Sequence, residues 1–317
     1  MTEHQVNLAQ PAGSFESAGT TQRFNPWRGM QKQNRFFQND EVAALIQRGL
    51  FYARAGVPIH FQGTAGRGKT AIAMEIAHRL GRTVSVLTGN DWLGADQMIG
   101  KHVGQSTTSL VDKYIQRVRR SEATVRHDWE NAILAEAMLH GHTLVYDEFT
   151  RSNAKANGIL LSVLEEGVLI SSDPVALTDH IEAHPDFRII LTSNPHDYAG
   201  VNASPDALLD RMITFQMARF SPKTEAGIVA ARTGVSSKMS ERIVTLLRDL
   251  IKNEGTCSMR AAIMIGQIAA MRLRSSDLSD ALLAQIAADV LQGRGVSLST
   301  NQIASHLTKS ASRKVTS

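Results

Sequence analysis

Eight consecutive residues have the composition and spacing of a phosphate-binding loop. They fit the pattern G-x-x-x-x-G-K-[ST] and follow a predicted strand: Gly63, Thr64, Ala65, Gly66, Arg67, Gly68, Lys69 and Thr70. The glycines allow backbone N–H groups to point at phosphate oxygens, and the helix predicted next adds the positive end of its dipole. We expect the Lys69 ammonium to reach the β and γ phosphates of a nucleotide, and the Thr70 hydroxyl to coordinate Mg²⁺.

Two acidic residues supply the groups that such a loop needs for hydrolysis. An apolar strand predicted at 143–146 ends in Asp147 and Glu148. We expect Asp147 to bind in the Mg²⁺ shell and Glu148 to polarise the attacking water as a general base. The alternative interpretation is an exposed pair of acids at a strand end.

A polar amide follows a later predicted strand. Asn194 precedes a proline, so it could simply form a turn. Its place at the end of a central strand also suits a residue that senses the γ-phosphate and positions water, and we expect this role for Asn194.

Strands alternate with helices in the first two thirds of the chain. We expect strands at 57–61, 84–87, 143–146 and 187–192, and helices at 41–55, 69–80 and 154–166. This alternation predicts an α/β fold, a P-loop doubly wound parallel sheet. After Phe220 apolar residues recur at helical spacing only, which predicts a smaller C-terminal all-helical lid domain.

Composition suggests how the chain divides. We expect a mobile N-terminal arm over 1–38, an α/β nucleotide-binding domain over 39–220, a helical lid domain over 221–295 and a C-terminal tail over 296–317. The arm is rich in Gln, Ser, Thr, Gly and Asn and has few aliphatic residues.

Composition also argues against several classes of protein. With 317 residues and 43% hydrophobic content, the chain can bury a sizeable core. Its longest apolar run, 261–271, is too short to span a bilayer, and the N-terminus does not resemble a secretory signal. A single cysteine, Cys257, excludes an intrachain disulfide and favours a reducing cytoplasm. The 34 basic and 30 acidic residues nearly cancel, so nucleic acid is not indicated as a partner.

The acidic motif carries a family resemblance. The stretch from Asp147 to Arg151 resembles the corresponding motif in the MoxR-like branch of the AAA+ superfamily, and the likeness covers roughly residues 41–294. Further blocks resemble the gas vesicle ATPases of that superfamily: 57–63, 143–152, 160–167, 192–195, 198–201 and 207–212.

This resemblance implies a homo-oligomeric ring, expected to be a hexamer, with ATP bound between subunits. An arginine of one subunit then completes the site of the next, and either Arg211 or Arg151 could provide it, with a structural salt bridge as the alternative for each. Arg260 resembles the arginine by which the lid senses the γ-phosphate, although it could also lie on a helix surface. Arg67 departs from the family, in which threonine or serine is common.

The function implied is that of a Mg-ATP-hydrolysing remodelling factor for gas vesicle assembly and enlargement. We expect it in the cytoplasm, in association with gas vesicles, with gas vesicle structural or accessory proteins as partners. One alternative is a MoxR-type activator that remodels a metalloenzyme for cofactor insertion. A nucleotide-gated scaffold and a nucleic-acid motor are further alternatives.

Weaker signals lie outside these motifs. Residues 98–129 carry a basic cluster, Lys113, Arg117, Arg119, Arg120 and Arg126, which suits a solvated helix face or a pore-side insertion of MoxR-like proteins. His180 and His184 are four residues apart but lack the pattern of a zinc site.

Overall fold

The computed structural model describes residues 36–111, 121–170, 180–194, 205–251, 258–273, 278–292 and 299–313. Within these ranges only the backbone is described for 102–111, 121–129 and 308–313. Most of the expected arm, the basic residues Lys113 to Arg120, and Cys257 therefore lie outside the described residues.

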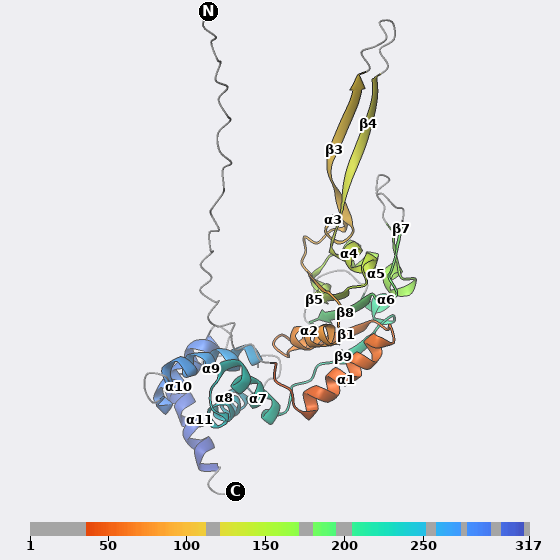
Figure 1. Ribbon diagram of the computed structural model, residues 1–317. Helices are drawn as coiled ribbons and strands as arrows, with labels where there is room; N and C mark the ends of the chain where they lie inside the picture. Colours follow the sequence, from red (N-terminus) through yellow and green to blue (C-terminus); the bar gives the residue numbers. More distant parts are fainter. Residues whose placement is uncertain are drawn as a thin grey trace, which may run out of the picture.

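A five-stranded parallel sheet with helices packed against it forms the part of the molecule before the C-terminal helices (Figure 1). Its strands lie in the order β2-β5-β8-β1-β9, with these bounds: β1 Ile59–Gln62, β2 Val84–Thr88, β5 Thr143–Asp147, β8 Arg188–Ser193 and β9 Ile213–Gln216. The expected fold class is confirmed. All strands expected from the sequence are present, and β9 is an additional edge strand.

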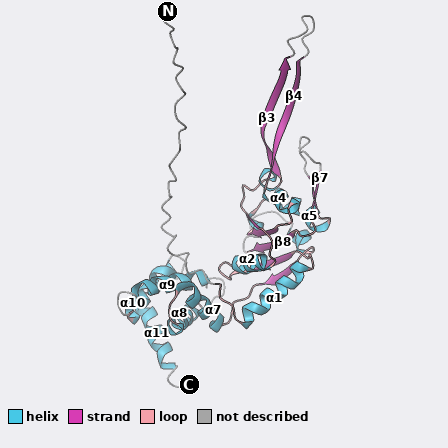
Figure 2. Ribbon diagram, in the orientation of Figure 1, coloured by secondary structure: helices cyan, strands magenta, loops and turns pink. Residues whose placement is uncertain are grey.

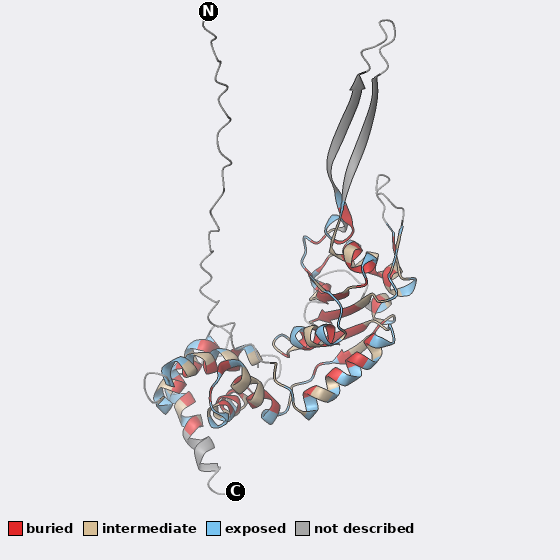
Figure 3. Ribbon diagram, viewed as in Figure 1, coloured by how far each residue is buried: buried red, intermediate tan, exposed pale blue. Residues whose placement is uncertain are grey.

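Alternate residues of the central strands enter two cores, one on each face of the sheet. Val145 and Ile190 pack with α1 (Asp40–Arg54) and α2 (Lys69–Arg79). Their neighbours Tyr146 and Leu191 pack with α4 (Ile133–Leu139) and α5 (Ala154–Glu165). A strand buried on both faces reads as an unbroken apolar run, which is why these strands are evident in the sequence (Figure 3).

Two antiparallel hairpins project from the sheet domain. They are β3 (Gly100–Val111) with β4 (Ser121–Asn131), and β6 (Val168–Ile170) with β7 (His180–Glu182). After the short α3 (Ala95–Met98), residues 100–111 and 121–131 form strands rich in threonine and serine, of which threonine favours strands, so the solvated helix face that we considered is wrong for these residues. Four of the five basic residues of that cluster lie outside the described residues. The pore-side alternative stays a prediction.

The described residues after β9 form helices only (Figure 2). These are α7 (Pro222–Thr233), α8 (Ser237–Leu250), α9 (Met259–Leu273), α10 (Asp280–Gln292) and α11 (Thr300–Arg313). They share one core, and α11 contributes Ile303 and Leu307 to it. Part of the expected C-terminal tail is thus a packed helix, because Ile303 and Leu307 fall on one helical face. The chain division proposed from the sequence otherwise stays a prediction.

No helix among the described residues is long and apolar enough to cross a membrane.

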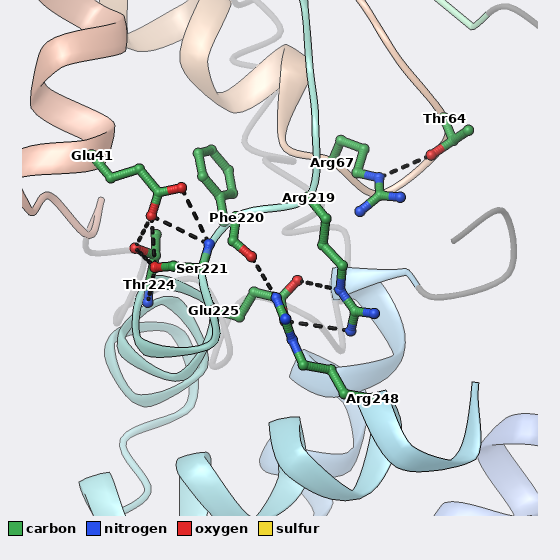
Figure 4. A network of polar contacts seen from close by, with 9 residues as sticks. All are labelled: Glu41, Thr64, Arg67, Arg219, Phe220, Ser221, Thr224, Glu225 and Arg248. Atoms are coloured by element: carbon green, nitrogen blue, oxygen red, sulfur yellow. Dashed lines mark hydrogen bonds and ion pairs between the residues drawn. The ribbon is translucent and has the colours of Figure 1, made fainter. Parts of the chain in front are cut away.

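Polar contacts join the start of α1 to the start of α7 (Figure 4). The Asn39 side chain caps α1 and also donates to the Thr224 hydroxyl at 2.7 Å. The Glu41 carboxylate accepts from the Ser221 hydroxyl at 2.8 Å and from the Thr224 hydroxyl. These bonds connect the sheet domain to the first helix of the lid.

Two arginines hold the linker between β9 and α7, residues 217–221, against the lid (Figure 4). The buried carboxylate of Glu225 accepts from Arg219 at 2.9 Å and from Arg248 at 2.7 Å. Arg248 also donates to the carbonyl of Phe220. The linker 217–221 is therefore fixed by residues of α7 and α8.

Replacing Glu41 should weaken the contact between α1 and α7 in a pH-dependent way. Partial burial raises the pKa of Glu41, but hydrogen bonds from Thr224 and Ser221 outweigh this and leave the pKa below its ordinary value. The carboxylate thus stabilises the fold at neutral pH, and that stabilisation is lost as pH falls below about 4.3, the ordinary glutamate value. Glu41→Gln should cost roughly 1 kcal/mol at pH 7, discounted for the exposure of Glu41.

Urea-unfolding midpoints at pH 7 and pH 3.5 would check this. The exposed neighbour Asp40, also in the first turn of α1, provides the matched variant Asp40→Asn. An equal deficit for Glu41→Gln at both pH values would contradict the assignment to the carboxylate.

Candidate functional site

The order of the strands in the sheet brings the carboxyl ends of β1, β5 and β8 next to one another. Strand β8 lies between β1, which leads into the glycine-rich loop, and β5, which ends in Asp147. Because the strands are parallel, the loop, the two acids and Asn194 after β8 share the carboxyl edge of the sheet, where open α/β sheets bind ligands.

The glycine-rich loop has the backbone geometry of a phosphate cradle. Gly66 and Gly68 have φ of 78° and 83°, a left-handed conformation that glycine adopts without strain. Lys69 opens α2, and its ammonium donates to the carbonyls of Gly63 at 2.7 Å and Thr64 at 3.0 Å. The buried side chain of Lys69 therefore holds its amino group over the loop.

Arg67 lies within the loop rather than in solvent. It is only 6% exposed, and its Nε donates to the Thr64 hydroxyl at 3.0 Å (Figure 4). This bond ties together two sides of the loop, so the long arginine side chain is accommodated within it.

The two acids are held differently. The Thr70 hydroxyl donates to Asp147 Oδ1 at 2.8 Å, so the expected metal ligands lie together. Glu148 has a φ of 54°, and no other non-glycine residue among those described has a positive φ. Its side chain accepts from Arg151 at 2.7 Å.

A cleft of about 260 Å³ lies between the loop and the lid. It is lined by polar groups of Lys69, Thr70, Asp147 and Glu148, and by a largely apolar wall: Phe36, Phe37, Val42, Phe220, Ile228, Met259 and Ile263. The mixture of charged and apolar walls suits a nucleotide, with phosphates at the loop and the base against the wall.

The lid contributes cations to the same cleft. Arg260 and Arg232 line it, from α9 and α7. The backbone N–H of Met259 donates to the carbonyl of Gly66 at 3.3 Å, so the first turn of α9 touches the loop directly. Arg260 therefore lies in the cleft beside the loop, and its role as a sensor of the γ-phosphate stays a prediction.

Five expected residues do not line this cleft: Gly63 and Thr64 at the start of the loop, and Asn194, Arg211 and Arg151. Asn194 follows β8 at the same sheet edge. Arg211 forms an ion pair with Glu165 at 2.6 Å and donates to the carbonyl of Ala207 at 2.5 Å. Arg151 contacts Glu148 from the turn after β5, η2 (Phe149–Arg151).

A buried histidine stiffens the strands beneath the loop. His60 on β1 is within hydrogen-bond distance of Ser193 on β8 at 2.8 Å and of Thr214 on β9 at 3.1 Å. Burial, and then the charge of Lys69, lower its pKa to about 4, so it is neutral at pH 7. Its role is structural, because its ring nitrogens are engaged by strand hydroxyls.

The donor set at the loop fits a magnesium ion. Mg²⁺ binds through one or two protein oxygens together with phosphate oxygens and water. The Thr70 hydroxyl and the Asp147 carboxylate provide such oxygens. No cluster of three or more histidine, cysteine or acidic residues that could hold a metal by itself occurs among the described residues.

Sequence reasoning overlooks two residues at the site. Thr192 bonds to both acids from β8, although the sequence motifs single out only Asn194 in that segment. Arg232 reaches the cleft because of the orientation of α7, for which the local sequence carries no signal. The strand-end position of Thr192 could have identified it.

The fold is shared with known ATPases. Residues 58–212 match the family model described as AAA domain (dynein-related subfamily). A solved variant of RuvB from Thermotoga maritima, 15% identical, superposes with a TM-score of 0.50 and covers 84% of this chain and 75% of its own. This likeness confirms the fold alone.

Proteins of similar sequence identify the family more specifically. Gas vesicle ATPase GvpN of Ancylobacter aquaticus is 38% identical over 262 residues, 82% of this chain and 73% of the relative. The GvpN of Haloferax mediterranei is 37% identical over 273 residues, 84% and 77% of the two chains. Protein NorQ of Paracoccus denitrificans is more distant, with 23% identity over 211 residues, 66% and 68% of the two chains. The chain therefore belongs to the gas vesicle ATPase GvpN family and is an AAA+ ATPase.

Proposed function

We propose that this ATPase hydrolyses Mg-ATP in the cleft between the glycine-rich loop and the lid, and that the resulting motion remodels proteins during gas vesicle assembly and enlargement. The observation that carries the proposal is the meeting of Lys69, the Thr70–Asp147 pair and Glu148 in one cleft. The names of the relatives support the gas vesicle role, and a cytoplasmic location is part of this proposal.

The loop binds and orients the nucleotide. Its backbone N–H groups face the phosphates, and Lys69 exchanges its bonds to the loop carbonyls for bonds to phosphate oxygens. Thr70 and Asp147 hold Mg²⁺, which when bound neutralises charge on the phosphates. The apolar wall around Phe220 and Ile263 receives the base.

Glu148 is the general base in this proposal. Its carboxylate accepts a proton from the water that attacks the γ-phosphate, while Asn194 orients that water. Arg151 pairs with Glu148 in the isolated chain, so that pair must open before the carboxylate can meet the water.

The lid links nucleotide to movement. Arg260 enters the cleft from the first turn of α9, and Met259 is bonded to the loop. Contact between Arg260 and the phosphates draws the lid toward the sheet domain, and its loss after hydrolysis lets the lid move away about the linker 217–221.

Arg211 is the better candidate for the arginine given to the neighbouring subunit of a ring. Its guanidinium lies away from the cleft of its own subunit, paired with the 57% exposed side chain of Glu165. Arg211→Ala should leave assembly intact and lower turnover by at least about 100-fold, because an arginine at the transferring phosphoryl group has effects of this size or larger. Turnover and molecular mass should be measured at the same protein concentration.

The partner of Arg211 offers the matched control. Glu165→Gln breaks the same ion pair but leaves the arginine, so it should retain nearly normal turnover. Equal losses in Arg211→Ala and Glu165→Gln would show that the ion pair is structural, and the trans role would then pass to Arg151.

Remodelling itself is tested in cells that form gas vesicles. We expect that a strain lacking this protein regains full-size vesicles with the wild-type chain but not with Glu148→Gln, and that gas vesicle proteins are captured by the Glu148→Gln chain in an ATP-dependent way. Normal vesicles in the strain that carries only Glu148→Gln would contradict an ATP-driven role.

A MoxR-type activator is the second candidate, favoured only by the distant likeness to NorQ. Restoration of a metalloenzyme's activity by the purified chain, with no effect on gas vesicles, would favour this candidate instead.

A further inference from the structure

A buried hydroxyl links the two acids of the site to the strand beside them. Thr192 on β8 is fully buried. Its Oγ1 donates to Asp147 Oδ1 at 2.5 Å and accepts from the backbone N–H of Glu148 at 2.9 Å. A hydroxyl has one proton and free lone pairs, so it can make both bonds at once, whereas an apolar side chain of the same shape makes neither.

The first bond fixes the carboxylate of Asp147. Its Oδ1 accepts from two hydroxyls, those of Thr70 and Thr192. These donors come from different elements, α2 and β8, and so hold the Oδ1 atom from two separate parts of the fold. Outer-shell partners of this kind orient metal-binding carboxylates.

The second bond fixes the turn that carries Glu148. A glutamate at φ 54° and ψ 40° is in the left-handed region, which is unfavourable for a residue with a side chain and persists where the surroundings hold it. Thr192 accepts from its N–H on one side. On the other side Gly89 is packed so closely that an added Cβ would lie 2.1 Å from the Glu148 carbonyl oxygen. The direction of the Glu148 side chain is thus set by these neighbours.

We propose that Thr192 is a positioning residue that places both the metal-binding carboxylate and the general base. The inference rests on the proposed function, because that function gives Asp147 and Glu148 their roles. Thr192 itself carries out no chemical step. It also makes β8 a mechanical link: Asn194 comes two residues after Thr192, directly past the end of the strand, so a movement of that strand end reaches both acidic residues through one hydroxyl.

The test compares Thr192→Val, which keeps the shape and removes both bonds, with Thr192→Ser, which keeps the hydroxyl. Two readouts are needed: steady-state turnover against Mg²⁺ concentration, and the affinity for a fluorescent ATP analogue with and without Mg²⁺. For Thr192→Val we expect the Mg²⁺ requirement to rise by about 10- to 100-fold and kcat to fall by at least about 10-fold. Without Mg²⁺, affinity for the analogue should change by less than about twofold, and Thr192→Ser should restore turnover.

A variant at a second buried hydroxyl distinguishes a loss of positioning from a loss of stability. Ser193 is equally buried on β8 but faces His60, so Ser193→Ala weakens the fold without touching the acids. It should keep the wild-type Mg²⁺ requirement. The proposal is overturned if Thr192→Val has a normal Mg²⁺ requirement and kcat, or if Ser193→Ala shows the same rise. A wild-type chain without turnover would instead refute the proposed function.

Discussion

Glu148→Gln is expected to lower ATP turnover by at least about 100-fold while leaving nucleotide binding intact, because an amide cannot accept the proton of the attacking water. The isosteric change preserves the turn after β5, whose backbone is held by Thr192 rather than by the carboxylate. Single-turnover hydrolysis and the affinity for a fluorescent ATP analogue should be measured on the same preparation.

The matched control is Glu166→Gln. Glu166 is an exposed glutamate at the end of α5, and it carries no role in the proposed mechanism. It should hydrolyse ATP at the wild-type rate. Substantial turnover in Glu148→Gln would remove the general-base assignment and direct attention to another water-activating group.

Lys69→Ala should abolish nucleotide binding at ordinary concentrations. The lysine supplies charge-assisted hydrogen bonds to phosphate oxygens, and losing roughly 3 kcal/mol of such bonding weakens affinity by about 100-fold or more. Binding of the fluorescent analogue, titrated with and without competing ATP, measures the effect directly.

Two comparisons keep this result interpretable. Lys155→Ala removes an exposed lysine from α5 and should bind normally. Lys69→Met keeps the buried stem of the side chain, so equal loss in Lys69→Ala and Lys69→Met assigns the effect to the charge rather than to packing. Near-normal affinity in Lys69→Met would contradict the phosphate contact.

The local features of the fold are predictable from the sequence. The central strands are buried on both faces and therefore appear in the sequence as apolar runs. The loop is recognisable by its motif, in which two glycines adopt a left-handed backbone conformation. The helices after Phe220 follow from their spacing alone. Thr70, Asp147 and Arg260 line one cleft, as the motifs and the family resemblance together predict.

Other features depend on contacts between distant segments. Thr192 lies 45 residues from Asp147, and only the position of β8 beside β5 brings them together. The ion pair of Arg211 with Glu165 likewise joins residues 46 positions apart. The hairpin β3–β4 could not be separated from a helix face by charge counting, because charge pattern carries no strand period.

The central claim is that ATP is hydrolysed in a cleft that a second copy of the chain completes. The most direct test is Mg-ATP turnover per subunit against protein concentration, with molecular mass read under the same conditions. The account predicts that specific activity rises as a large assembly forms and that it is lost in Glu148→Gln without loss of that assembly. Turnover that is independent of concentration in a monomer would contradict it.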